Sequence, residues 1–324
     1  MGKINILTGA AGFIGSVLGK ELTTQGLDNI LAVDDFSKTE KAGNWESAKY
    51  IDLHDRDHLI QWLGKNAADV GFVFHIGART DTAEFDKNVF DKLNVNYSKD
   101  LWRICAQNKI PFIYASSAAT YGGGEFGYSD DHALIPKFKP LNPYGESKQE
   151  FDCWVLEQKE QPPFWAGLKF FNVFGPNEYH KERMASVVFH AFNQISRTGA
   201  MKLFRSHRSD FADGMQMRDF IYVKDIASIV SFLAEHRPQS GIYNAGTGKA
   251  RAFLHLAEAV FAAMDKKADI SFIDTPEDIR DKYQYFTEAD MSKLRNAGYT
   301  KEFFTLEAGI EDYVRNYLIT GRTL

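Results

Sequence analysis

Apolar residues in the first half of the chain gather in short runs that are separated by longer amphipathic stretches. The runs Ile4–Leu7, Asn29–Asp34 and Ile110–Ala115 consist mostly of aliphatic and aromatic residues. Short, nearly continuous apolar runs are typical of strands that are buried on both faces. The stretches between them, one ending near Gln25 and one covering 89–107, are long enough for helices. Strands that alternate with helices predict a doubly wound, parallel α/β sheet.

Further runs extend this pattern. We expect a short strand at Tyr50–Asp52 and a strongly apolar one within Asp69–Ala78 that ends in a turn of small residues. The second half predicts a strand at Trp165–Phe170, a strand and turn at Tyr243–Gly248, and an amphipathic helix near Phe253–Met264. Two final helices follow. No repeat, low-complexity tract or long linker separates the halves, so a second lobe is expected to be interwoven with the first.

A glycine-rich turn follows the first expected strand and opens a helix. Its glycines stand at positions 9, 12 and 15. Such a turn lets the backbone approach a pyrophosphate closely, while the helix N-terminus holds the negative charge. We therefore predict a dinucleotide site at Gly9, Gly12, Phe13, Ile14 and Gly15.

The second strand ends in Asp34, about 20 residues past the glycines, where a carboxylate meets an adenosine ribose. Asp34 alone favours NAD, with Asp35 beside it. Lys38, Lys41 and Arg56 follow in neighbouring loops and are able to hold a 2′-phosphate. The residues themselves therefore leave NAD and NADP open.

The small-residue turn after the strand within 69–78 is a further cofactor contact, because such a turn brings backbone close to a ligand. Asn94 is a candidate hydrogen-bonding residue nearby, whereas His75 is expected to pack at the strand end rather than to catalyse. The turn residues expected at the cofactor are Ile76, Gly77, Ala78, Arg79 and Thr80.

Tyr144 and Lys148 lie four residues apart and therefore share one face of a helix. A lysine ammonium beside a phenol favours the phenolate, so the pKa of Tyr144 is expected to fall toward neutral pH. Tyr144 is then a candidate acid/base for an alcohol or carbonyl. Ser116 and Ser117 end the strand that begins at Ile110, and Ser117 directly precedes the run Ala-Ala-Thr-Tyr-Gly.

Charge and cysteine content narrow the function class. The formal net charge of −5 argues against nucleic-acid or membrane-surface partners. Cys105 and Cys153 show neither CxxC nor metal-ligand spacing, so we expect reduced thiols and no metal. The N-terminal apolar run is too short for a signal peptide or a membrane span. We therefore expect a cytoplasmic protein.

The glycine motif, the Ser117 stretch and the Tyr144-x-x-x-Lys148 pair, in this order, resemble the extended short-chain dehydrogenase/reductase superfamily. The resemblance implies a Rossmann-type dinucleotide-binding domain over 1–172. It also implies a smaller α/β substrate lobe over 173–324, with about 215–250 returning to the first domain. In that superfamily the serine orients the reacting oxygen, the tyrosine transfers the proton, and the lysine lowers the tyrosine pKa and holds the nicotinamide ribose.

Later stretches resemble one branch, the ADP-L-glycero-D-manno-heptose 6-epimerases. They include Tyr114–Gly123, Phe171–Pro176, His180–Ser186, Arg218–Asp225 and Tyr283–Tyr299. The resemblance implies a homo-oligomer, a pentamer, that epimerises an ADP-heptose with tightly held NADP for lipopolysaccharide-core synthesis. It adds Lys181 as a second catalytic residue and Val173 and Lys181 as cofactor contacts. The implied substrate contacts are Ser117, Asn172, Arg183, His190, Phe204, Arg205, Ser206, His207, Arg218 and Tyr283.

The chain departs from that branch at several positions. Arg183 replaces a small residue, Ile76 and Arg79–Thr80 differ in the cofactor loop, and an insertion lies between Ser206 and Arg218. Other nucleotide-sugar 4-epimerases and 4,6-dehydratases share everything through Lys148, although a dehydratase usually has an acidic pair at Ala118–Ala119. A net oxidoreductase and a non-catalytic dinucleotide-binding protein are the remaining alternatives.

Overall fold

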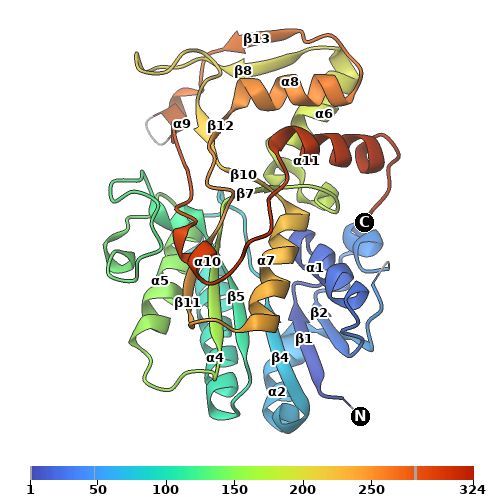
Figure 1. The fold of residues 1–324 in the computed structure, drawn as a ribbon, viewed down its shortest axis with the longest axis vertical. Coiled ribbons are helices and arrows are strands. Elements are labelled where there is room, and N and C mark those ends of the chain that lie inside the picture. The colour runs from blue at the N-terminus through green and yellow to red at the C-terminus, as the bar shows by residue number, and fades with distance from the viewer. Residues whose placement is uncertain (1, 47, 281–282) are drawn as a thin grey trace.

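Seven parallel strands form the central sheet (Figure 1). The computed structural model describes residues 2–46, 48–280 and 283–324. The strands of the sheet are β1 (Ile4–Thr8), β2 (Ile30–Asp34), β3 (Asp52–Asp55), β4 (Val70–His75), β5 (Phe112–Ser117), β6 (Trp165–Phe170) and β11 (Gly241–Ala245). They are ordered β11-β6-β5-β4-β1-β2-β3, and the direction of winding reverses between β1 and β4. The predicted doubly wound α/β fold is confirmed.

Helices cover both faces of this sheet (Figure 1). On one face α1 (Phe13–Thr24) packs against α7 (Val223–His236). The other face carries α2 (Arg56–Asn66), α4 (Tyr97–Gln107) and α5 (Pro143–Glu157). Every residue of β2, β5, β6 and β11 is buried between these layers, which explains why their sequences are so strongly apolar.

A second, smaller lobe stands above the carboxyl ends of the strands (Figure 1). There β8 (Met201–Phe204) pairs in parallel with β13 (Ile270–Ile273). The helix α8 (Phe253–Ala263) packs against both α6 (Val187–Thr198) and α11 (Leu306–Tyr313).

Short strand pairs join the two lobes. The strand β7 (Asn172–Phe174) pairs in parallel with β10 (Phe220–Tyr222), and β9 (Met217–Arg218) pairs antiparallel with β12 (Arg251–Ala252). The chain then returns to the central sheet at β11, inside the range 215–250, while the domain division at residue 172 remains a prediction. The remaining helices are α3 (Lys87–Phe90), α9 (Glu277–Arg280) and α10 (Ser292–Asn296).

Two elements differ from the sequence-based expectation. The strand expected at Tyr50–Asp52 begins at Asp52 and ends at Asp55, because pairing with β2 defines this polar edge strand. The helix expected over 89–107 begins as α3 and passes through a π-helical turn, Asp91–Asn96, before α4. A polar strand at the sheet edge and a π-helical turn leave no regular spacing of apolar residues in the sequence, so the apolar pattern does not predict either of them.

Across the described ranges, none of the helices has the length and apolar character needed to cross a membrane.

Candidate active site

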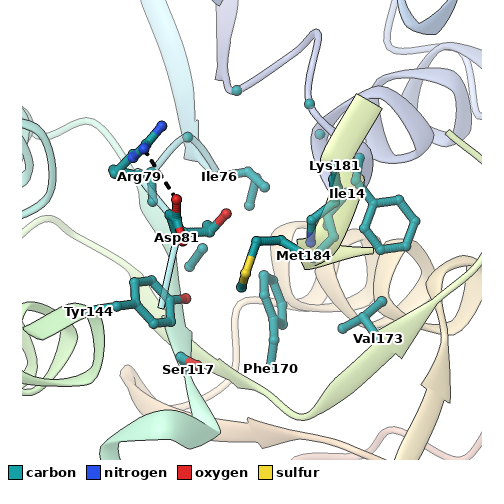
Figure 2. A pocket seen from close by; sticks show the side chains of 18 of the residues that line it. Ile14, Ile76, Arg79, Asp81, Ser117, Tyr144, Phe170, Val173, Lys181 and Met184 are labelled. Carbon is teal, nitrogen blue, oxygen red and sulfur yellow. Dashed lines mark hydrogen bonds and ion pairs between the residues drawn. The ribbon is translucent and has the colours of Figure 1, made fainter. Parts of the chain in front are cut away.

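A cleft of about 830 Å³ lies at the carboxyl ends of the central strands, below the second lobe. Ligands of open α/β sheets bind at this edge, close to the point where the winding reverses. Figure 2 shows side chains from both lobes pointing into the cleft. The predicted residues that line it are Gly9, Gly12, Phe13, Ile14, Gly15, Asp34, Lys41, Arg56, Ile76, Gly77, Ala78, Arg79, Thr80, Ser117, Tyr144, Lys148, Asn172, Val173, Lys181 and Arg183.

The glycine-rich turn forms a cradle at one end of the cleft. Gly9 has a φ of 73°, in the left-handed region that favours glycine. Gly12 precedes α1 without any side chain to cap the helix, so the positive helix end is open to an anion. A Cβ atom at Gly15 would lie 2.0 Å from the Gly9 carbonyl oxygen. The turn therefore needs glycine for its own packing and fits the pyrophosphate of a dinucleotide.

Replacing Gly15 by alanine is expected to abolish retention of dinucleotide and to lower the melting temperature. The added methyl group would collide with backbone, which has no means to move aside without opening the turn. The control is Gly64→Ala in α2, because a Cβ there meets nothing within 4 Å. Helical alanine is favoured over glycine by about 0.5–1 kcal/mol, so this control should melt slightly higher. A Gly15→Ala protein that kept its dinucleotide would contradict the assignment.

A carboxylate and several cations surround the adenosine end of the predicted site. Asp34 accepts hydrogen bonds from the Ala11 backbone N–H at 2.9 Å and from Lys41 Nζ at 3.3 Å. Arg56 lies 3.5 Å from Asp35, which does not itself line the cleft. The carboxylate of Asp34 thus already has protein donors, and positive charge from Lys41 and Arg56 faces the same space.

The loop that follows β4 is held by hydrogen bonds to the side chain of Asn94. Asn94, in the π-helical turn, accepts from the Arg79 backbone N–H and donates to the Arg79 carbonyl. Asn94 is buried and supports the cofactor loop rather than lining the cleft. His75 bridges the hydroxyls of Thr8 and Ser98, and burial together with the charge of Lys148 lowers its pKa to about 3. His75 therefore packs at the strand end as a neutral residue.

Tyr144, Ser117 and Lys148 meet where β5 ends against α5. The side chain of Ser117 lies near the phenol of Tyr144 and favours its ionisation, whereas the hydroxyl of Ser116 donates to Asp152 at 2.7 Å. Lys148 donates from Nζ to the Ala115 carbonyl at 2.8 Å. This geometry favours Ser117 over Ser116 as the residue that orients a reacting oxygen.

Burial dominates the acid strength of this group. It raises the pKa of Tyr144 above its ordinary value even though the neighbouring side chain of Ser117 opposes that shift. It lowers the pKa of Lys148 to about 8, against the opposing charge of Asp152. The structure therefore differs from the expectation that Lys148 pulls the pKa of Tyr144 down, because desolvation is the largest influence on that pKa. Tyr144 is therefore a neutral hydrogen-bond donor in the protein alone, and further positive charge nearby would favour its ionisation.

Lys181 approaches the same cleft from a short 3₁₀ helix, Tyr179–Met184 (Figure 2). Its ammonium lies 5.4 Å from the ring centre of Phe13. Burial lowers the pKa of Lys181, while the nearby carboxylate of Glu178 partly restores it. Tyr144 and Lys181 thus reach one cavity from different elements.

Two residues that sequence reasoning missed stand at the cleft mouth. Asp81 lies 3.4 Å from Arg79 and 3.1 Å from Arg183, so two positions that depart from the epimerase branch share one carboxylate. Met184 points into the cleft, and Thr82 approaches its sulfur at 3.8 Å (Figure 2). Asp81 and Arg183 are 102 residues apart, and no local pattern predicts such a pair.

The remaining predicted substrate residues do not line this cleft. His190 lies beside it, with Nε2 3.4 Å from the Arg183 carbonyl oxygen. A second cluster forms in the smaller lobe, where Tyr283 contacts Phe204 edge-on and the guanidinium of Arg218. The same cluster contains Arg205, Ser206 and His207, linked through Gln216, Asp213 and Tyr285.

A parallel sheet with a glycine cradle, and a serine–tyrosine–lysine group at its carboxyl edge, define a dinucleotide-dependent enzyme that acts on an alcohol or carbonyl. Residues 5–246 match the model of the NAD dependent epimerase/dehydratase family. The chain belongs to this family and, within it, to the ADP-L-glycero-D-manno-heptose-6-epimerases.

Relatives and a solved structure support that placement. The chain is 49% identical to an ADP-L-glycero-D-manno-heptose-6-epimerase of Fusobacterium nucleatum subsp. nucleatum, with 97% of each chain covered. It is 40% identical to the enzyme of that name from Brachyspira hyodysenteriae, with 95% and 96% covered. The crystal structure of the Helicobacter pylori enzyme of that name matches with a TM-score of 0.80 and 26% identity, over 97% of this chain and 96% of that one.

Proposed function

We propose that this chain epimerises ADP-D-glycero-D-manno-heptose to ADP-L-glycero-D-manno-heptose at C6″ and so supplies the lipopolysaccharide core. The observation that carries the mechanism is that Tyr144 and Lys181 enter one cleft from different elements, beside a dinucleotide cradle (Figure 2). Inverting a secondary alcohol by oxidation and reduction requires hydride transfer at both faces of one carbon. Proton transfer then needs a group for each of the two orientations.

A bound dinucleotide supplies the hydride acceptor and donor through its nicotinamide. Ser117, which lies beside the phenol of Tyr144, orients the reacting oxygen by hydrogen bonding. Tyr144, ionised once further positive charge enters the cleft, takes the proton from the C6″ hydroxyl of one epimer. After the resulting ketone rotates in the cleft, Lys181 donates a proton of its ammonium to the oxygen from the other side, and proton exchange with solvent restores both groups.

The lowered pKa of Lys181 suits that role. Burial increases the share of neutral amine at neutral pH, so the same side chain is able to accept and to return a proton. Glu178, itself buried, keeps the amine from losing its basicity altogether.

The nucleotide part of the substrate is proposed to extend into the second lobe. Arg218 and Tyr283 offer a guanidinium and a ring beside Phe204–His207, and these groups suit a diphosphate and an adenine. Asn172 and Arg183 line the cleft and His190 lies beside it, and all three are proposed to contact the sugar.

We propose NADP as the cofactor. Lys41 already neutralises Asp34, and Arg56 faces the same space, so a 2′-phosphate would meet two cations. A double change of Lys41→Met and Arg56→Met should lower the NADP-to-NAD ratio in purified protein by roughly tenfold or more, because charge-assisted hydrogen bonds contribute about 1.5–3 kcal/mol each. Mass spectrometry of the released dinucleotide measures the ratio, with the exposed Lys65→Met in α2 as control. An unchanged ratio would assign the selectivity to other residues.

A panel of sugar nucleotides tests the substrate. We expect kcat/KM for ADP-heptose to exceed that for UDP-glucose, UDP-N-acetylglucosamine and dTDP-glucose by at least about a hundredfold, because buried polar contacts discriminate strongly. Preference for a UDP-sugar would make the protein a 4-epimerase instead.

The setting of the reaction is also a proposal. The resemblance to the epimerase branch supports the proposal of a cytoplasmic homo-oligomer, a pentamer. Light scattering on the eluting protein measures its mass.

A further inference from the structure

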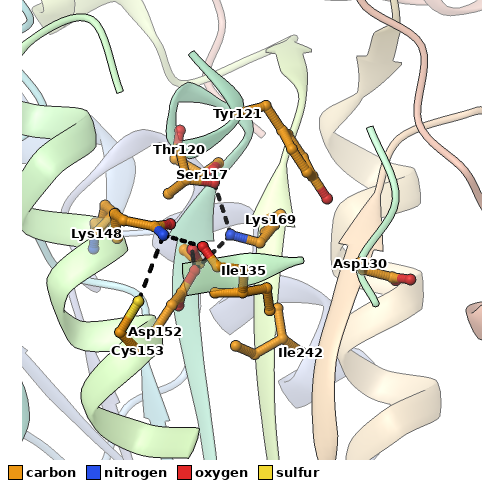
Figure 3. A network of polar contacts seen from close by, with 12 residues as sticks. Ser117, Thr120, Tyr121, Asp130, Ile135, Lys148, Asp152, Cys153, Lys169 and Ile242 are labelled. Atoms are coloured by element: carbon orange, nitrogen blue, oxygen red, sulfur yellow. Dashed lines mark hydrogen bonds and ion pairs between the residues drawn. The ribbon is translucent and has the colours of Figure 1, made fainter. Parts of the chain in front are cut away.

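A fully buried ion pair lies directly behind the proposed catalytic residues (Figure 3). Lys169 Nζ is 2.6 Å from Asp152 Oδ2, and neither side chain has any exposed surface. Removing two charges from water is costly, and apolar residues of similar volume often stabilise a protein as well or better. A contribution to stability alone therefore does not account for this ion pair.

The hydrogen-bond partners of the pair lead to the end of β5. Asp152 accepts from the hydroxyls of Tyr114 at 2.9 Å and Ser116 at 2.7 Å. Lys169 donates to the Thr120 hydroxyl at 2.7 Å, and that hydroxyl donates to the Ser117 carbonyl at 2.9 Å. Ser117 is thus held from both sides, by its neighbour Ser116 and by its own carbonyl.

The pair also fixes the helix that carries the other two residues. Asp152 follows Lys148 by four residues on α5, whereas Lys169 lies on β6 as the register partner of Ser116. The pair therefore ties α5 to β5 and β6 at the height where Tyr144 and Lys148 meet Ser117.

We propose that Asp152 and Lys169 are positioning residues that hold Ser117, Tyr144 and Lys148 in their reacting arrangement and set the charge around them. This inference rests on the proposed function for its kinetic readout. Neither side chain lines the cleft, so both act through their neighbours.

The charge of Asp152 gives the proposal a measurable sign. The carboxylate raises the pKa of both Tyr144 and Lys148, so its removal should lower both. His75 at the end of β4 also faces Lys148, beside Tyr144 itself, and His75 stays neutral because its pKa is about 3. Lys148 should therefore lose its proton at lower pH once Asp152 is neutral, and loss of the Lys169 charge offsets this only in part, because Asp152 is the charged group that acts on Lys148.

The test compares Lys169→Met with the neutral pair Asp152→Asn/Lys169→Met. The single change leaves a buried carboxylate without its cation and should melt much lower, whereas the double change should recover most of the melting temperature. In the double variant we expect kcat to fall about tenfold to a hundredfold with little change in KM, since small misplacements of reacting groups are costly. The alkaline limb of the pH profile should also move to lower pH.

A second readout does not depend on turnover. NMR of ¹³C-labelled lysine, with the Lys148 signal assigned by its loss in Lys148→Met, follows the titration of Lys148 directly. A lower pKa of Lys148 in the double variant supports the proposal even if the wild-type protein does not turn over ADP-heptose. Failure to turn over ADP-heptose would contradict only the proposed substrate.

Two controls separate positioning from folding. Lys169→Arg keeps the positive charge, so kcat should stay within a few fold of the wild type and the Lys148 titration should not shift. This variant also provides the test of the proposal if the neutral double variant does not fold. Neutralising the exposed pair Arg315 and Asp265 (2.7 Å) should change neither readout. A neutral double variant with wild-type kcat and an unshifted Lys148 titration would show that the pair is only structural. A Lys169→Arg variant that lost activity while folding normally would also overturn the proposal.

Discussion

Replacing Tyr144 by phenylalanine is expected to reduce kcat about 10²–10⁴-fold, the usual contribution of a positioned acid/base group. The phenol is half-buried, lies near Ser117 and forms part of the cleft wall, so its loss removes the group that exchanges a proton with the C6″ oxygen. The ring remains and still packs near Phe90 at 6.4 Å between ring centres. Folding and dinucleotide retention should therefore change little.

The matched control is Tyr299→Phe in the C-terminal region. Tyr299 is buried and its phenol lies beside a serine, donating to Ser228 at 3.1 Å, but it does not line the cleft. Its turnover should match that of the wild type. Near-normal epimerisation by Tyr144→Phe would mean that another group transfers the proton.

Replacing Lys181 by methionine is expected to slow the oxidation of one epimer about a hundredfold or more, and that of the other much less. Methionine keeps length and apolar contact with Phe13 but has no exchangeable proton. Because Tyr144 and Lys181 are assigned to different epimers, each variant should oxidise slowly the epimer to which its replaced residue is assigned. Reduction of the bound dinucleotide, followed by absorbance in a single turnover from each pure epimer, measures both rates.

The exposed Lys249→Met provides the control for loss of one lysine charge. Equal slowing of both epimers in Lys181→Met would indicate that Lys181 binds cofactor or substrate without exchanging the proton. Undiminished rates for both would remove Lys181 from the mechanism.

Local signals in the sequence were sufficient for the dinucleotide cradle. Glycines at a strand-to-helix turn, and a carboxylate at the end of the next strand, are set by contacts between residues close in sequence or in adjacent strands. The structure accordingly places Gly9, Gly15 and Asp34 in one cleft. The edge strand β3 was shifted because its pairing with β2 is independent of any apolar period.

Long-range charges were not predictable in the same way. The sequence suggested that Lys148 lowers the pKa of Tyr144, but burial of both groups reverses the balance. The pairs Asp81–Arg183 and Asp152–Lys169 join segments that only the fold brings together. Burial and contacts between segments distant in sequence therefore set the pKa values and ion pairs of the site, which the motifs alone do not predict.

The most direct test of the account is epimerisation in D₂O with no added cofactor. ADP-D-glycero-D-manno-heptose is incubated with the purified protein, proton NMR follows C6″, and mass spectrometry identifies any released dinucleotide. Hydride that leaves C6″ and returns to the same carbon never exchanges with solvent. We therefore expect a mixture of both epimers with hydrogen retained at C6″ and with NADP released on denaturation. Deuterium at C6″, or no conversion by protein that carries its dinucleotide, would contradict it.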